Sequence, residues 1–285
     1  MRRFVSDVVL LSVTVLALIH GLPAQEITHP STSNAPLSSG TSADRKEGTN
    51  VSADDSQDQR NDHTLLRRGL DDQRQIYAAP FRPKNLKWDL LFVAGTGALI
   101  AFDRHISAQI PASGAHVSQV ISDVGLYSTT ASVAGLWLFG MKKSDSRARE
   151  TGVLALESFA NTAGVLALTQ AAAGRERPTE ENRDGRFWHN NALGSSFPSG
   201  HSAFTWTMAT VIAHEYPKPW VQWLSYGTAL AVSTTRVTGL KHYSADVAVG
   251  SAFGYLIGRQ IFNSHCAPGL SPKCNRHPRE KHAVE

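Results

Sequence analysis

The sequence of 285 residues has little cysteine, little charge and little strand-like alternation. Its only two cysteines, Cys266 and Cys274, match no common spacing of zinc ligands. No cluster of Asp, Glu and His that could hold a metal lies beside its polar motifs. Charged residues make up only 18% of the chain, and no dense Lys/Arg run with interleaved aromatics occurs, which argues against nucleic-acid binding. Apolar and polar residues rarely alternate, so strands are not expected.

The charge that is present is mildly basic. The formal net charge is +4 and the sequence pI is about 9.1, which suits anionic substrates or an anionic membrane surface. Charged residues concentrate outside the central apolar segments, so the core is more apolar than the mean hydropathy of -0.22 implies. The length is enough for one helical domain with tails.

The N-terminus has the pattern of an export signal. Two arginines follow Met1, and a short apolar run covers residues 8–19. The small residue Ala24 offers a cleavage position before Gln25, which predicts a signal peptide over residues 1–24. An uncleaved anchor is the alternative. In either case the chain is expected to be exported to the cell envelope, as a periplasmic or membrane-associated protein facing the periplasm.

The remaining chain divides into a polar linker, a helical domain and a tail. Residues 25–80 are rich in polar side chains and are predicted to be a disordered linker. Residues 86–262 form the predicted domain, and residues 263–285 form a flexible tail. Because disulfides persist in exported proteins, Cys266 and Cys274 in this tail are expected to pair.

The domain is expected to be all-α, a bundle of about six core helices. Six apolar or small-residue segments support this number, at residues 88–106, 117–141, 147–173, 202–216, 220–235 and 245–262. Gly125 is a possible break in the second. Residues 124–141 and 152–173 approach the length that crosses a bilayer, while other segments are short or interrupted. Hydropathy therefore leaves open a soluble bundle or a membrane-embedded one.

One short stretch, Phe-Pro-Ser-Gly-His at residues 197–201, stands between a polar loop and an apolar helix. Pro198 suits a helix start, Ser199 is a good N-cap, and Gly200 lets a ligand approach the backbone. The N–H groups of a helix N-terminus form an anion site. His201 on this first turn could pass a proton to the bound anion.

Two more polar stretches accompany it. An Arg-Pro pair at residues 177–178 closes an Ala-rich run, and Arg236 precedes His242 and Asp246. His242 and Asp246 are four residues apart, so on a helix they share one face. A carboxylate there can hydrogen-bond one imidazole nitrogen and leave the other as a nucleophile. Arginines bind phosphate through two parallel hydrogen bonds.

Together these stretches resemble the signature of the type 2 phosphatidic-acid phosphatase family, whose fold is shared with bacterial non-specific acid phosphatases and vanadium haloperoxidases. That signature reads Lys, six residues, Arg-Pro; then Pro-Ser-Gly-His; then Ser-Arg, five residues, His, three residues, Asp. The resemblance covers roughly residues 86–262. Two positions depart from it, since Gln170 stands in the place of lysine and Thr235 in the place of serine.

The resemblance implies a role for each motif residue. His242 would attack phosphorus and form a phosphohistidine, with Asp246 orienting its ring. His201 would protonate the leaving oxygen and then activate water. The phosphate oxygens would be bound by a wider set of positions, namely Arg177, Ser199, Gly200, Arg236 and Gln170. The change from lysine to Gln170 removes a cation, which Arg175 could partly replace.

The function implied is a phosphatase that needs no metal or cofactor and acts on lipid phosphates or polyprenyl pyrophosphate. One alternative is a soluble periplasmic non-specific acid phosphatase. A second is a vanadate-dependent haloperoxidase, or a phosphate-binding protein that has lost turnover. The expected partners are a phosphorylated lipid or small phosphate ester and a membrane surface, with no nucleic acid. No oligomeric state follows from the sequence.

Overall fold

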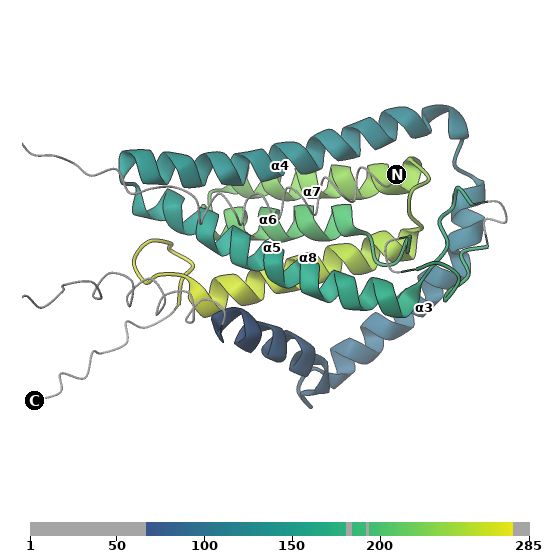
Figure 1. The fold of residues 1–285 in the computed structure, drawn as a ribbon, viewed down its shortest axis with the longest axis horizontal. Helices are drawn as coiled ribbons and strands as arrows, with labels where there is room; N and C mark the ends of the chain where they lie inside the picture. The colour runs from purple at the N-terminus through teal and green to yellow at the C-terminus, as the bar shows by residue number, and fades with distance from the viewer. Residues whose placement is uncertain (1–66, 181–183, 192–193, 276–285) are drawn as a thin grey trace, which may run out of the picture. The chain divides into compact units, whose positions relative to one another are not determined.

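The computed structural model describes residues 67–180, 184–191 and 194–275, and these residues contain helices and loops but no strand. Six long helices, labelled as in Figure 1, form the domain: α3 (Leu86–Ala108), α4 (Ala115–Lys143), α5 (Ser146–Ala173), α6 (Gly200–Glu215), α7 (Pro219–Thr238) and α8 (Ser244–His265). Two 3-10 turns, η1 (Ala79–Phe81) and η2 (Ala112–Gly114), precede α3 and α4. The predicted all-α fold is confirmed.

Local sequence signals explain several helix ends. Asp145 caps α5, because its side chain accepts a hydrogen bond from the N–H of Ala148 at 2.9 Å. Gly174 ends the same helix in the left-handed conformation, with φ at +50°. Pro219 begins α7, where its missing N–H costs no helical hydrogen bond.

Helix α4 does not break at Gly125. A Cβ on this residue would lie 2.4 Å from Cγ2 of Val232 on α7. The glycine therefore allows α4 and α7 to approach each other, and the break considered from the sequence does not occur because the helix can absorb one glycine.

Three glycines on α8 let it pack closely on α6. A Cβ on Gly250 would lie 2.4 Å from the carbonyl oxygen of Ser199, and one on Gly254 would lie 2.1 Å from that of Ala203. Gly258 repeats the pattern one turn later, at 2.8 Å from the oxygen of Thr207. The spacing of four residues places all three on one face, so the backbones meet there. This packing fixes the first turns of α6 and α8 side by side.

In Figure 1, α4 to α8 run side by side, while α3 leaves the bundle at an angle. The connection from α5 to α6 and the connection from α7 to α8 lie at the same end of the bundle. At the other end, α4 turns into α5 and α8 reaches the C-terminal loop. The core between the helices holds Leu154, Val211, Ile257 and Phe262.

The end of the predicted 25–80 linker is folded. Residues 67–78 are helical, and Asp72 within them is buried beside His265, with oxygen to Nε2 distances of 2.8 and 2.9 Å. Ile76 packs against the core, and Gln73 donates a hydrogen bond to the carbonyl of Asn161. These contacts order a segment whose composition alone indicates disorder. The predicted signal peptide, the rest of the linker and the last ten residues lie outside the described residues.

Cys266 and Cys274 are joined by a disulfide across eight residues of sequence. Cys266 directly follows α8 and is fully buried. The bond closes the loop that covers this end of the core.

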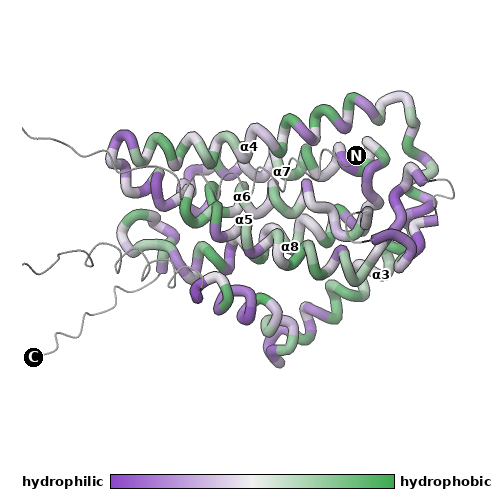
Figure 2. The backbone as a smooth tube through the Cα atoms, viewed as in Figure 1, coloured by the Kyte–Doolittle hydropathy of each residue, from purple (hydrophilic) through white to green (hydrophobic). Residues whose placement is uncertain are grey.

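Among the residues that the structure describes, three helices are long and apolar enough to cross a membrane, by length and composition: Leu86–Ala108, Ala112–Lys143 and Ser146–Ala173. Hydrophobic positions recur along α3 and α4 in Figure 2. Large apolar side chains on these two helices are exposed, among them Leu90, Leu91, Val120 and Val124. Exposed apolar surface of this extent is typical of contact with lipid or with a partner.

Candidate active site

Four helix ends meet where the predicted site residues lie. The C-terminal end of α5 carries Gln170, and the first turn of α6 carries His201. The last turn of α7 carries Arg236, and the first turn of α8 carries Asp246. The structure thus brings the three motifs together, with two helix N-termini turned to one place, which favours anion binding there.

The Pro-Ser-Gly-His loop is held against α8 by its backbone. The N–H of Ser199 donates to the carbonyl oxygen of Asp246 at 2.9 Å. The Ser199 hydroxyl is buried and accepts a hydrogen bond from Ser202 at 3.2 Å. A Cβ on Gly200 would find its nearest neighbours at 3.9 Å, which is ordinary contact. Packing therefore does not require glycine at this position.

The tautomer of His242 follows from its partner. Its Nδ1 lies 2.7 Å from the carbonyl oxygen of Ser196. Because a carbonyl oxygen only accepts, Nδ1 carries the proton and Nε2 keeps its lone pair. Burial, with smaller contributions from Arg177 and Arg236, holds the pKa of His242 well below its usual value of 6.5. The ring is therefore neutral and suited to nucleophilic attack through Nε2.

Asp246 lies next to this ring but does not hold it directly. Its Oδ2 is 3.8 Å from Nδ1 of His242 and accepts instead from the N–H of Tyr243 at 2.8 Å. Its Oδ1 accepts from Arg175 at 2.6 Å. Burial raises the pKa of Asp246 to about 6, and Arg175 opposes that rise, so the carboxylate is charged at neutral pH.

His201 is paired with a residue that the sequence motifs do not contain. Its Nε2 lies 3.0 Å from Oδ1 of Asp123, which is on α4. Arg236 donates to the same oxygen at 3.2 Å and to the hydroxyl of Ser122 at 3.0 Å. Burial lowers the pKa of His201, and the hydrogen bond to Asp123 opposes this. A lone carboxylate within a long apolar helix was the available signal for Asp123.

Two arginines supply positive charge beside the histidines. Arg177 donates to the carbonyls of Ser195 and Lys241, each at 3.2 Å. Burial lowers the pKa of Arg177, and it lowers that of Arg236 to about 10, so both remain charged at neutral pH. Arg236 is only 6% exposed, which strengthens its interaction with any anion that enters.

Gln170 lies beside the loop but is already engaged. Its amide nitrogen donates to the carbonyl of Pro198 at 3.1 Å and lies 4.0 Å from the Cβ position of Gly200. Arg175, which the sequence suggested as a substitute cation, is 2% exposed and binds Asp103 and Asp246. It faces the carboxylates and not the phosphate loop.

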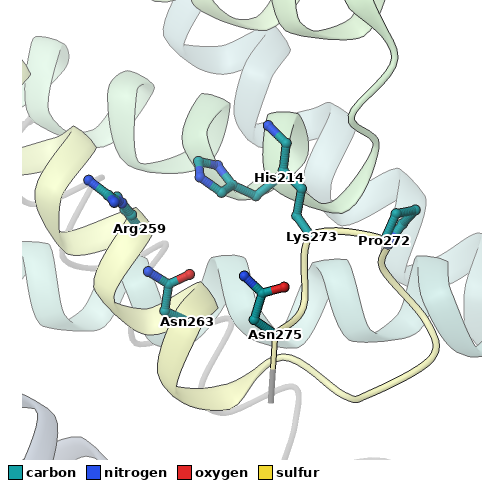
Figure 3. Close-up of a pocket in the computed structure, with 6 residues that line it drawn as sticks. All are labelled: His214, Arg259, Asn263, Pro272, Lys273 and Asn275. Carbon is teal, nitrogen blue, oxygen red and sulfur yellow. The ribbon is translucent and has the colours of Figure 1, made fainter. Parts of the chain in front are cut away.

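A pocket lies at the end of α6 and α8 that is far from these residues (Figure 3). It is lined by His214, Arg259, Asn263, Pro272, Lys273 and Asn275, and it contains none of the predicted site residues. Within the part of the chain that the structure describes, no three His, Cys, Asp or Glu side chains are grouped as a metal site would require.

Comparison with known proteins agrees with the motifs. Residues 151–267 match the PAP2 superfamily. A segment of 76 residues is 33% identical to lipid A 1-phosphatase of Porphyromonas gingivalis, and it covers 26% of this chain and 17% of that protein. The chain thus spans about a sixth of the length of this curated relative.

A transmembrane PAP2-type phosphatidylglycerolphosphate phosphatase from Bacillus subtilis is similar in structure, with a TM-score of 0.44 and 19% identity over 72% of this chain and 97% of that one. The matched segment 151–267 contains all three motifs.

Proposed function

We propose that the protein is a phosphatase that transfers a phosphoryl group to His242 and then to water. The observation that carries this proposal is the neutral, buried imidazole whose Nδ1–H is held by Ser196 and whose Nε2 keeps a lone pair. Two charged arginines, Arg177 and Arg236, lie close enough to affect its pKa. A phosphate monoester placed among them would meet a nucleophile and a positive field together.

In the first step, the Nε2 lone pair of His242 forms a bond to phosphorus as the ester P–O bond breaks. The departing oxygen keeps the electron pair of the broken P–O bond and takes a proton from His201. Asp246 at 3.8 Å stabilises the positive charge that the ring gains. The proton on Nδ1 stays with the ring, because the carbonyl oxygen of Ser196 accepts its hydrogen bond but is too weak a base to take the proton.

In the second step, water attacks the phosphorus of the phosphohistidine. His201 takes the proton of the water, and the N–P electron pair returns to Nε2 of His242. Inorganic phosphate leaves. The imidazole of His201 thus acts first as an acid and then as a base.

The substrate we propose is a phosphorylated lipid at a membrane surface. Three apolar helices, α3, α4 and α5, have the length and composition of membrane spans. The curated relative named above is a lipid A 1-phosphatase, although this chain matches only a sixth of it. The proposed site faces the exported side of the membrane.

The test is phosphate release by purified protein in detergent, with EDTA, from lipid phosphates and from soluble phosphate esters. We expect release from lipid phosphates to continue in EDTA, because arginines and helix N-termini supply the positive charge. His242→Ala should abolish a phosphoenzyme that is labile to acid and stable to alkali, and His201→Ala should slow its formation and breakdown. Activity that disappears in EDTA and returns with a divalent cation would contradict the mechanism. Release from soluble esters alone would contradict the substrate.

A further inference from the structure

A buried cluster of charge lies behind the proposed nucleophile. Arg175 donates through Nη1 to Asp246 at 2.6 Å and through Nη2 to Asp103 at 2.8 Å. Its Nε donates to the carbonyl of Gly185 at 3.2 Å. The guanidinium also lies against the rings of Phe187 and Tyr243, with 4.9 and 4.4 Å from its carbon to their centroids. Every nitrogen of the group is therefore used within the protein.

The two carboxylates hold the start of α8 in the same way. Oδ2 of Asp246 accepts from the N–H of Tyr243 at 2.8 Å, and Oδ1 of Asp103 accepts from the N–H of Ala245 at 3.0 Å. Both are fully buried, at 0% and 1% exposed. A helix N-terminus favours negative charge, so the cluster is placed where two carboxylates are tolerated.

The cluster reaches beyond the segment of the chain that matches the superfamily. Asp103 lies on α3, outside residues 151–267 that match the superfamily. It is the only residue of α3 that is fully buried, on a helix whose other side chains are exposed or partly exposed. A buried carboxylate within such an apolar helix is costly unless it has a partner and a role.

We propose that Asp103 and Arg175 are positioning residues for Asp246, so that α3 takes part in building the active site. This inference rests on the proposed function of His242. Arg175 fixes Asp246 beside the nucleophile and keeps it ionised. Asp103 offsets the charge of Arg175, so that the cluster keeps one net negative charge facing the ring of His242.

The two residues act on Asp246 in opposite directions. Loss of Arg175 leaves two buried carboxylates without their shared cation, which favours protonation of one of them. Loss of the charge on Asp103 leaves Asp246 paired with Arg175 alone, which favours its ionised form but cancels its field at His242. The charged or titratable groups around Asp246 are Arg175, Asp103, His242, Tyr243 and Arg177.

The experiment measures kcat and KM against pH for three variants in detergent. Arg175→Met should move the acid limb of kcat to higher pH, and Asp103→Asn should move it to lower pH. Both should lower kcat by about tenfold or more, as loss of partners that orient a functional histidine does. KM should change little, because neither residue faces the phosphate. Arg175→Lys should restore part of the rate, since it returns the charge without the three-way geometry.

Arg104→Gln is the matched control. Arg104 is adjacent to Asp103 on α3, but it is exposed and pairs with Asp184 at 3.0 Å. It should leave both limbs in place. Asp103→Asn nearly preserves shape, so it decides the question if Arg175→Met does not fold. Movement of the acid limb in the same direction in Arg175→Met and Asp103→Asn, no movement in either, or a loss expressed only in KM would overturn the inference.

Vanadate binding against pH separates this inference from the proposed function. Wild-type protein that releases no phosphate from any substrate contradicts the proposed function. The opposite shifts should still be seen in the pH dependence of vanadate affinity, because that binding also places an anion at His242. Equal vanadate profiles in Asp103→Asn and wild type would contradict the positioning role.

Discussion

At the scale of single residues, the proposed site differs chiefly at Gln170 from the phosphatase signature that it resembles. The amide lies at the phosphate loop, as the spacing of the motif requires, and donates to the carbonyl of Pro198. Arg175 cannot take over the missing charge, because it is buried among carboxylates. In the proposed site, Arg177 and Arg236 are therefore the deeply placed cations.

We expect Gln170→Lys to raise turnover and to tighten inhibition by vanadate. The added cation would lie where negative charge gathers in the transition state, an interaction that can be worth about 3 kcal/mol. Phosphate release and vanadate inhibition measure the effect. Thr169→Lys is the matched control, since it adds the same charge one residue earlier, where the side chain bonds the carbonyl of Val165. Equal effects from both variants would mean that general charge, and not position, is responsible.

The pair of His201 and Asp123 predicts a pH dependence. His201 must be protonated to act as an acid, and burial lowers its pKa from the usual 6.5. The rate should therefore fall as pH rises through this lowered pKa. Asp123 opposes the lowering. Asp123→Asn should therefore move the alkaline limb of kcat to lower pH, with a smaller maximum. Profiles of kcat against pH provide the measurement, and Ser128→Ala, an exposed position on the same helix, provides the control. An alkaline limb that stays in place would show that another group sets it.

Sequence motifs predicted which residues gather at the site but not how they are held. His201, His242, Asp246 and the two arginines follow from motif spacing. Ser196 as the partner of Nδ1 could not be predicted, because any carbonyl near the ring would serve. Asp103 contacts residues 72 and 142 positions away in sequence, and Asp123 contacts residues 78 and 113 positions away. Only the fold brings these residues together.

At the scale of helices, the apolar runs predicted all six core helices to within a few residues. Residues 67–78 are helical although they were predicted to belong to a disordered linker, because Asp72 and Gln73 are ordered by partners on α8 and α5. Glycine was the other ambiguous signal. In α4 and α8 it marks close packing between helices, and sequence alone does not separate that role from a break.

Packing of α6 on α8 should be sensitive to one methyl group. A Cβ at Gly254 would lie 2.1 Å from the carbonyl of Ala203, a backbone atom that cannot move alone. Gly254→Ala should lower the free energy of unfolding by about 1–3 kcal/mol and reduce kcat, because it separates the first turns of α6 and α8. Thermal unfolding and phosphate release measure both.

Gly227→Ala on α7 is the matched control for this substitution. Apart from its own stretch of helix, no heavy atom of the described residues lies within 4 Å of its Cβ position. It should be neutral or slightly stabilising, because alanine favours a helix by about 1 kcal/mol over glycine. Loss of stability in Gly227→Ala comparable to that in Gly254→Ala would mean that the effect is not one of close packing.

At the scale of the whole domain, the proposed site and the disulfide lie at opposite ends of α8. Asp246 is on its first turn, and Cys266 directly follows its last residue. A helix of 22 residues is about 33 Å long, close to the thickness of the apolar core of a bilayer. If α3, α4 and α5 cross a membrane, the site and the disulfide face different compartments. The sequence analysis predicted that the site and the disulfide are both exported, and in a membrane-spanning bundle only one of them can be.

Basic residues indicate which end is cytoplasmic. Lys142, Lys143, Arg147 and Arg149 lie where α4 turns into α5, at the disulfide end of the bundle. Short loops rich in Lys and Arg stay in the cytoplasm. We therefore expect the site to face the exported side and the Cys266–Cys274 end of the bundle to face the cytoplasm, where the disulfide seen in the structure would be reduced to two thiols.

Labelling of intact cells with a membrane-impermeant reagent provides the final measurement. A cysteine introduced as Ser107→Cys, near the end of α3 at the site end, should react from outside, in a background with Cys266 and Cys274 changed to serine. In the native protein, those two cysteines should react only after the cells are opened, and without prior reduction. Reaction of Ser107→Cys and of reduced Cys274 from the same side would mean that the bundle does not span the membrane. The exposed apolar faces of α3 and α4 would then have to rest on the membrane surface or on a partner.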